Sequence, residues 1–107
     1  MYGTIGRFHV KPGMEAQFRQ LIEEQGRAFE AGQVPGFVVS YGYRMDADLN
    51  EYYLAVVFES REAYWANAQS AEQDARYRQW LPLLAGEPEW RDGEIVGGYA
   101  QQARATM

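Results

Sequence analysis

Cysteine is absent from this 107-residue chain, and histidine occurs once, as His9. Without thiols, the sequence excludes disulfides, thiolate nucleophiles and zinc sites built on cysteine. A single histidine also rules out metal sites with several histidines, and no group of acidic residues has the spacing of a known metal-binding loop. We therefore expect no metal site.

Positive charge is scarce as well. Ten Lys and Arg stand against fifteen Asp and Glu, so the net charge is −5 and the pI is near 4.8. An acidic chain lacks the electrostatic footprint of a protein that binds nucleic acid or an anionic membrane. No apolar run approaches the ~18 residues of a membrane-spanning helix, and the first residues lack the pattern of a signal peptide. We expect a cytoplasmic protein with no nucleic-acid or membrane partner.

Aromatic residues, by contrast, are abundant. Eight Tyr, five Phe and three Trp make up 15% of the chain. The length fits a single domain, residues 1–107, in which residues 103–107 are expected to form a flexible tail. A core of this size does not readily hide so many rings, which indicates a ligand cavity, a partner subunit or both.

Hydrophobic periodicity divides the chain into strands and helices. Segments in which apolar and polar residues alternate predict strands at Tyr2–Val10, Phe37–Arg44, Glu51–Glu59 and Glu94–Gln101. Apolar stripes at helical spacing predict helices at Met14–Ala31 and Ser60–Leu84. Ser70 with Gln73 three residues later is a capping box, so the second helix is expected to break near Gln69.

This order of elements predicts an α+β fold of the ferredoxin-like kind. Under the right-handed crossover rule, it gives a four-stranded antiparallel sheet with both helices on one face. In the second strand, alternation from Phe37 is expected to turn Val39, Tyr41 and Tyr43 toward the helices. The other face stays uncovered, and its expected apolar residues are Ile5, Tyr53, Ala55 and Val57. An apolar sheet face of this kind calls for a second subunit, so we expect a homodimer joined through these faces.

Four segments carry a family resemblance. V-K-P-G-M-E-A-Q-F at Val10–Phe18 joins a strand to an amphipathic helix, and P-G-F at Pro35–Phe37 enters a strand. F-E-S-R-E-A-Y at Phe58–Tyr64 and L-P-L-L-A-G at Leu81–Gly86 follow in order. Together they resemble the antibiotic biosynthesis monooxygenase (ABM) domain family. The resemblance implies a dimeric α/β barrel with a cavity between sheet and helices in each subunit.

The resemblance does not select one reaction, because a fold hosts many functions. The family includes cofactor-independent quinone-forming monooxygenases, haem-degrading enzymes and proteins that act on small signalling molecules. Haem-degrading members resemble a different set, with Asn, Trp and His where this chain has Gly6, Asn67 and Tyr77. All three differ, which argues against haem degradation and favours a reaction without a cofactor.

The resemblance and the helical stripes together suggest a set of site residues. Asn67 is the candidate polar contact to a substrate oxygen, with Trp65 and Tyr77 as its catalytic companions. Candidate substrate-binding residues are Tyr41, Tyr64, Trp80 and His9. Several of them have a purely structural alternative: Tyr64 and Trp80 in the core, Trp65 in an interface, and His9 on the uncovered sheet face. Trp65 and Asn67 diverge by roughly 200° on an ideal helix, so both reach a cavity only if the helix bends or one lies at its edge.

Two functions of different class follow. One is a cofactor-independent monooxygenase that oxidises a small aromatic hydroquinone or phenol with dioxygen. Arg44 and Arg76 are then candidates to pair with an anionic substrate, although surface salt bridges are their default role. The other is a non-catalytic ligand-binding or assembly domain, in which the aromatic residues only form the core and an interface.

Overall fold

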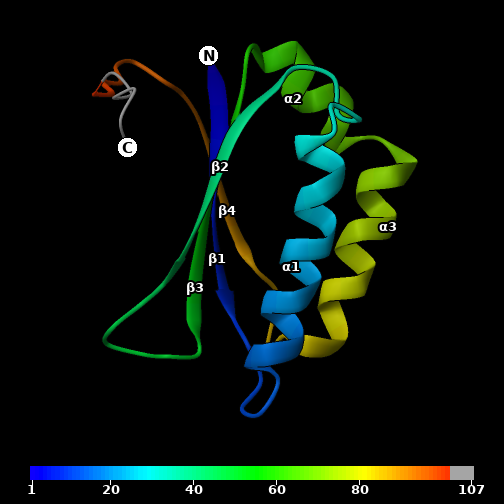
Figure 1. The fold of residues 1–107 in the computed structure, drawn as a ribbon, viewed down its shortest axis with the longest axis vertical. Helices are drawn as coiled ribbons and strands as arrows, with labels where there is room; N and C mark the ends of the chain where they lie inside the picture. Colours follow the sequence, from blue (N-terminus) through cyan, green and yellow to red (C-terminus); the bar gives the residue numbers. More distant parts are fainter. Residues whose placement is uncertain (102–107) are drawn as a thin grey trace, which may run out of the picture.

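The computed structural model of the chain describes residues 1–101, and its elements confirm the predicted fold class. The strands are β1 (Tyr2–His9), β2 (Phe37–Arg44), β3 (Glu51–Phe58) and β4 (Glu89–Glu94). The helices are α1 (Glu15–Glu30), α2 (Arg61–Ala68), α3 (Ala71–Trp80) and a 3₁₀ turn, η1 (Leu81–Leu83). All neighbouring strands are antiparallel in the order β2-β3-β1-β4, and the helices lie on one side of the sheet (Figure 1).

Local capping explains where the helices begin and why the second one breaks. The Ser60 hydroxyl accepts a hydrogen bond from the Ala63 N–H at 3.0 Å and starts α2. The Ser70 hydroxyl accepts one from the Gln73 N–H at 3.1 Å and starts α3, which confirms the predicted break near Gln69. Each cap satisfies a backbone donor that has no partner within its helix.

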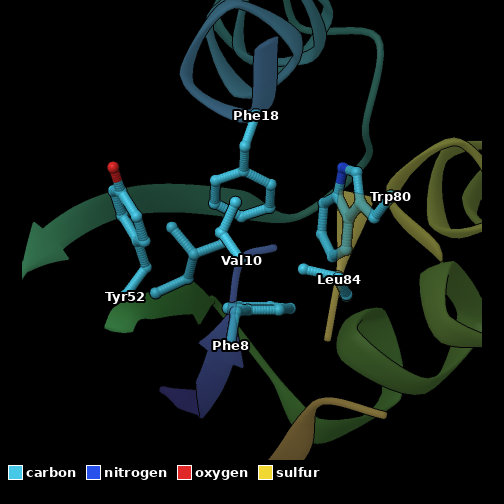
Figure 2. Packing of buried hydrophobic residues seen from close by; sticks show 7 residues of the cluster. Phe8, Val10, Phe18, Tyr52, Trp80 and Leu84 are labelled. Carbon is cyan, nitrogen blue, oxygen red and sulfur yellow. The ribbon is translucent and has the colours of Figure 1, made fainter. Parts of the chain in front are cut away.

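The core lies between the helices and the near face of the sheet. Even-numbered residues of β1 and β3 point toward the helices, and Phe8 and Phe18 are fully buried there. Figure 2 shows their rings together with Tyr52 and Trp80 around Val10. Phe8 meets Trp80 edge to face, with 5.3 Å between ring centroids. Burial of such side chains contributes about 1.5–3 kcal/mol each and fixes α1 and α3 on the sheet.

The predicted orientation of the second strand is wrong beyond its first residue. Phe37 pairs with Phe58, but Val39 pairs with Val57, so the register shifts by one residue between them. This irregularity inserts an extra residue and reverses the alternation. Tyr41 therefore pairs with Ala55 and lies on the sheet face opposite the helices, as do Val39 and Tyr43.

The predicted position of the last strand is also wrong. The strand occupies Glu89–Glu94 instead of Glu94–Gln101, and it pairs with β1 from Tyr2 to Arg7. Trp90 decides this register because its indole lies over Gly6, the one residue type that leaves room for the ring. Val96 and Tyr99, which were expected to anchor the strand, are fully solvent-exposed. The expected tail at 103–107 lies outside the described residues.

The far face of the sheet has no helix over it (Figure 1). Ile5, Tyr41 and Tyr43 are 54%, 61% and 53% exposed on it. At one end of this face, Glu51 forms an ion pair of 2.6 Å with Arg7. Among residues 1–101, no helix is long and apolar enough to cross a membrane.

Candidate functional site

A cavity of about 430 Å³ lies between the sheet and the three helices. Its wall is mainly apolar, and seven of its lining residues are aromatic: Phe29, Phe58, Tyr64, Trp65, Tyr77, Trp80 and Trp90. Ligand pockets in proteins usually measure about 300–1,000 Å³ and combine an apolar wall with a few polar groups. This cavity has the size and composition of a site for a small flat molecule.

Five of the seven predicted site residues line this cavity. They are Tyr64, Trp65, Asn67, Tyr77 and Trp80. Asn67 and Trp65 both reach it because α2 ends at Ala68, one residue beyond Asn67, and the chain then turns into α3. Trp65 is 39% exposed, which places it at the edge of the cavity. The bend required by the divergence of these two side chains is therefore present.

The other two predicted site residues, Tyr41 and His9, lie on the far face of the sheet. Tyr41 is turned away from the helices by the register shift in β2, so the prediction that it lines the cavity is wrong. His9 follows the odd-numbered face of β1, and its Nε2 lies 3.3 Å from Glu51 Oε2. This position agrees with a structural role for His9 on the uncovered sheet face, which was the alternative to substrate binding.

A connected polar group closes the cavity where α2 meets α3. We call it the Asn67 cluster, and it consists of Asn67, Gln73 and Arg76. Asn67 Nδ2 donates to Gln73 Oε1 at 3.3 Å, and Arg76 Nη2 donates to Asn67 Oδ1 at 3.4 Å. Arg76 Nε also donates to Gln73 Oε1, at 3.1 Å. These bonds fix the amide and the guanidinium side by side at the cavity wall.

Arg76 brings a positive charge to this aromatic cavity. Its guanidinium carbon lies 5.0 Å from the ring centroid of Phe29, which stabilises the cation by cation–π attraction. Within residues 1–101, no carboxylate lies at ion-pair distance from it. The charge is therefore available to an anionic ligand.

A second polar pair lies on the β4 side of the cavity. The Tyr64 hydroxyl donates to Asp92 Oδ1 at 2.8 Å, and both residues line the cavity. Burial raises the pKa of Tyr64 to about 12, with a further contribution from the hydrogen bond to Asp92. Tyr64 thus stays protonated at neutral pH and acts as a hydrogen-bond donor.

Trp80 joins the cavity to the core. Its Nε1 donates to Gln25 Oε1 at 2.9 Å, and Gln25 Nε2 in turn donates to the Arg76 carbonyl oxygen at 3.1 Å. Its ring is stacked near Trp90, with 6.2 Å between centroids. Trp80 is only 7% exposed, so it serves both as a core residue and as part of the cavity floor.

The contribution of β4 to the cavity was not predicted from the sequence. Trp90 and Asp92 alternate on one face of this strand and both line the cavity. The alternating W-R-D pattern after Pro88 is typical of a strand. This run is short and polar, however, so it predicts a strand less strongly than the apolar residues that follow it. Among residues 1–101, no group of three or more His, Cys, Asp or Glu side chains could hold a metal ion.

Residues 1–80 match the family model described as antibiotic biosynthesis monooxygenase. The chain belongs to this family. The sequence resemblance noted at the outset is thereby confirmed. No curated protein matches the sequence.

Solved structures with the same fold have low sequence identity to this ABM chain. SnoaB, a cofactor-independent oxygenase from Streptomyces nogalater, crystallised as a point mutant, is 18% identical with a TM-score of 0.79, over 94% of this chain and 97% of that one. A Caulobacter crescentus CB15 protein assigned to antibiotic biosynthesis monooxygenases is 20% identical, with a TM-score of 0.80 and 90% of each chain covered. One from Deinococcus radiodurans is 12% identical, with a TM-score of 0.79 over 96% and 100%.

These likenesses establish the fold of the ABM chain, and the family match covers only part of its cavity. Trp90 and Asp92 lie beyond the residues that match the family model, 1–80. The Asn67 cluster lies within them. The cavity therefore combines residues inside the matched range with residues of β4 that lie outside it.

Proposed function

We propose that this ABM protein is a cofactor-independent monooxygenase that oxidises a small aromatic hydroquinone or phenol with dioxygen. One observation carries the proposal: an aromatic cavity of about 430 Å³ holds an amide and an unpaired guanidinium fixed at its wall. Flat substrates stack on such a wall, and a cation beside it stabilises the anion that forms when a phenol loses its proton.

The proposed chemistry needs only the substrate and dioxygen. The phenolate gives one electron to dioxygen, and the resulting substrate radical and superoxide join through a new carbon–oxygen bond. The peroxide takes up the proton that the phenol lost. Its oxygen–oxygen bond then breaks together with the carbon–hydrogen bond at the same carbon. The products are a quinone and water, so one oxygen atom enters the quinone and the other leaves as water.

Five residues of the cavity have proposed roles in binding the substrate. The Asn67 amide hydrogen-bonds the substrate oxygen, and Arg76 stabilises its negative charge. Tyr77, Trp65 and Trp80 form the stacking walls around the ring.

Asp92 is the proposed proton acceptor. The other carboxylate at the cavity, Asp74, forms an ion pair of 2.9 Å with Arg78. Asp92 instead accepts a hydrogen bond from the neutral Tyr64 hydroxyl. Tyr64 orients this carboxylate and donates to it. We propose no role in the cavity for His9 or Tyr41.

Oxygen uptake tests the proposed reaction. A panel of one- to three-ring hydroquinols and phenols is added to the protein in an oxygen electrode. We expect one quinone formed for each dioxygen consumed, with no hydrogen peroxide released. Asn67→Ala and Arg76→Gln should lower kcat/KM by about tenfold or more each, because each removes a hydrogen bond to a charged group. Uptake that is equal in both variants and the native protein contradicts the proposal.

We also propose that the chain forms a homodimer through the far face of the sheet. Ile5, Tyr41 and Tyr43 are more than half exposed on this face, and burial of such a patch stabilises an interface. Sedimentation at micromolar concentration tests this, and Tyr41→Glu should shift the protein toward monomer. A native protein that sediments as a monomer removes the idea.

A cytoplasmic location and the absence of nucleic-acid partners remain proposals of the same kind. The net charge of −5 supports the absence of nucleic-acid partners, because it disfavours binding to polyanions. Cell fractionation and a filter-binding assay with nucleic acid test them.

A further inference from the structure

A second cavity of about 350 Å³ adjoins the first, between α1 and the β2–β3 hairpin. Ile22 and Leu54 line both cavities, so the two lie on either side of these side chains. Arg19 of α1 and Arg44 of β2 line only the second one. The second cavity therefore adjoins the proposed reaction site but has two arginines of its own in its wall.

Tyr52 lines this second cavity and carries a buried polar group. The residue is 5% exposed, and its hydroxyl has no hydrogen-bond partner among residues 1–101. Figure 2 shows the hydroxyl at the edge of the core, directed away from the neighbouring labelled rings. Nearly all buried polar groups in proteins are hydrogen-bonded, so an unpartnered one needs an explanation. A ligand atom that bonds to this hydroxyl would supply it.

The two arginines give the second cavity a positive character that is unusual in this acidic chain. Neither guanidinium is within ion-pair distance of a carboxylate in the described part of the chain. The one carboxylate in the cavity wall, Glu23, is paired instead with Arg27, at 3.3 Å. The cavity thus offers two cations and one hydroxyl to a ligand.

We propose that this second cavity is an anion subsite for the carboxylate of an acidic aromatic substrate. The inference rests on the proposed function, because it specifies the class of substrate that the site takes. Arginine forks bind carboxylates through paired, charge-assisted hydrogen bonds, and the Tyr52 hydroxyl donates a further one. The phenol ring lies in the first cavity beside the Asn67 cluster, and the acidic group passes Ile22 and Leu54 to reach Arg19 and Arg44.

The size of the two spaces suits a substrate of two or more rings. An engineered cavity of about 150 Å³ holds one benzene molecule. The first cavity alone, at about 430 Å³, therefore has room for two or three fused rings. A substituent at the far end of such a molecule is the part that extends into the second cavity.

Calorimetric titration with a matched pair of ligands tests the subsite. The pair is 6-hydroxy-2-naphthoate and 2-naphthol, which share the phenol and differ in the carboxylate. We expect the native protein to bind the naphthoate about tenfold more tightly or better, as two charge-assisted hydrogen bonds predict. The double variant Arg19→Gln/Arg44→Gln should lose most of this preference, because only the Tyr52 hydroxyl is then left to bond the carboxylate. Tyr52→Phe should retain part of the preference.

Two further variants make the test specific. Lys11→Gln removes an exposed positive charge that lines neither cavity and should keep the full preference. Arg76→Gln should also keep it, because Arg76 belongs to the first cavity. Equal binding of both ligands by the native protein overturns the proposal. So does a preference that Arg76→Gln abolishes and the double variant retains.

The titration separates this proposal from the proposed reaction. Binding is measured under argon, so the carboxylate preference is recorded whether or not the ligand is oxidised. A preference mostly lost in the double variant, together with no oxygen uptake on any phenol, supports the subsite and contradicts the monooxygenase. Oxygen uptake without any carboxylate preference supports the monooxygenase and contradicts the subsite.

Discussion

Removing the Tyr52 hydroxyl should make the protein more stable. The side chain is 5% exposed, and its oxygen is buried without a hydrogen-bond partner among residues 1–101. In the unfolded chain this hydroxyl bonds to water, and folding forfeits that bond. Tyr52→Phe deletes the oxygen and leaves the ring, which packs on Phe18 with 5.2 Å between centroids. The packing is kept while the cost of burial is removed.

The size of the effect follows from the cost of an unsatisfied buried group. That cost is about 1–3 kcal/mol. Because Tyr52 lies beside a cavity, we take the lower end of this range and expect the free energy of unfolding to rise by about 1 kcal/mol. A change of about 1 kcal/mol shifts the Tm of a domain of 60–100 residues by roughly 4–8 °C. Because this chain is slightly longer, we expect the lower part of that range.

Thermal and urea unfolding followed by circular dichroism measure the change. The matched control is Tyr53→Phe, on the next residue of β3, whose side chain lies on the opposite face of the sheet. It should change stability by no more than about 0.5 kcal/mol. A Tyr52→Phe protein whose Tm is equal to or below that of the native protein would show that the hydroxyl is hydrogen-bonded in the folded protein and is not an unpartnered group.

Three other substitutions test the packing and electrostatics of the fold. Gly36→Ala should destabilise the protein far more than Gly32→Ala in urea unfolding. Both glycines have a positive φ, 79° at Gly36 and 76° at Gly32, so both substitutions strain the backbone. Only at Gly36 would the new Cβ also lie 2.5 Å from the side chain of Ala63. Equal losses would contradict this. Gly6→Ala puts a Cβ 2.6 Å from the β4 indole ring, so we expect a loss of about 1–3 kcal/mol and weaker naphthol binding, and unchanged values would refute the packing. Tyr64 has a pKa raised to about 12 in the folded protein, so its contribution to stability is complete below about pH 10 and is lost as the pH rises through about 12. Tyr64→Phe should therefore flatten the decline in the free energy of unfolding at alkaline pH. An identical decline in the variant and the native protein would refute this.

The positions of most elements could be predicted because their signals are local. Ser60 and Ser70 cap helices with their own side chains, and these bonds depend only on residues three positions away. The apolar stripe of α1 likewise specifies which side of the helix Phe18 occupies. Asn67 and Tyr77 were predicted as cavity residues from this periodicity and from the family resemblance, and both line the cavity.

The errors arose where a distant residue decides the outcome. Tyr41 was assigned to the wrong face because an irregularity between Phe37 and Val39 shifts the pairing with β3, and nothing in the strand itself marks it. The last strand was misplaced for a similar reason. Trp90 fits where it does because Gly6, more than eighty positions earlier in the sequence, has no side chain.

The sequence by itself determined the class of fold, the family and the aromatic character of the site, since each depends on composition, local periodicity or short motifs. Only the tertiary structure decided which polar groups meet in the cavities. Arg76 reaches Asn67 across the α2–α3 turn, and Tyr64 reaches Asp92 on a strand 28 positions away. Such pairs form because packing of the helices on the sheet brings separate segments within hydrogen-bond distance, and no local pattern along the chain encodes that distance.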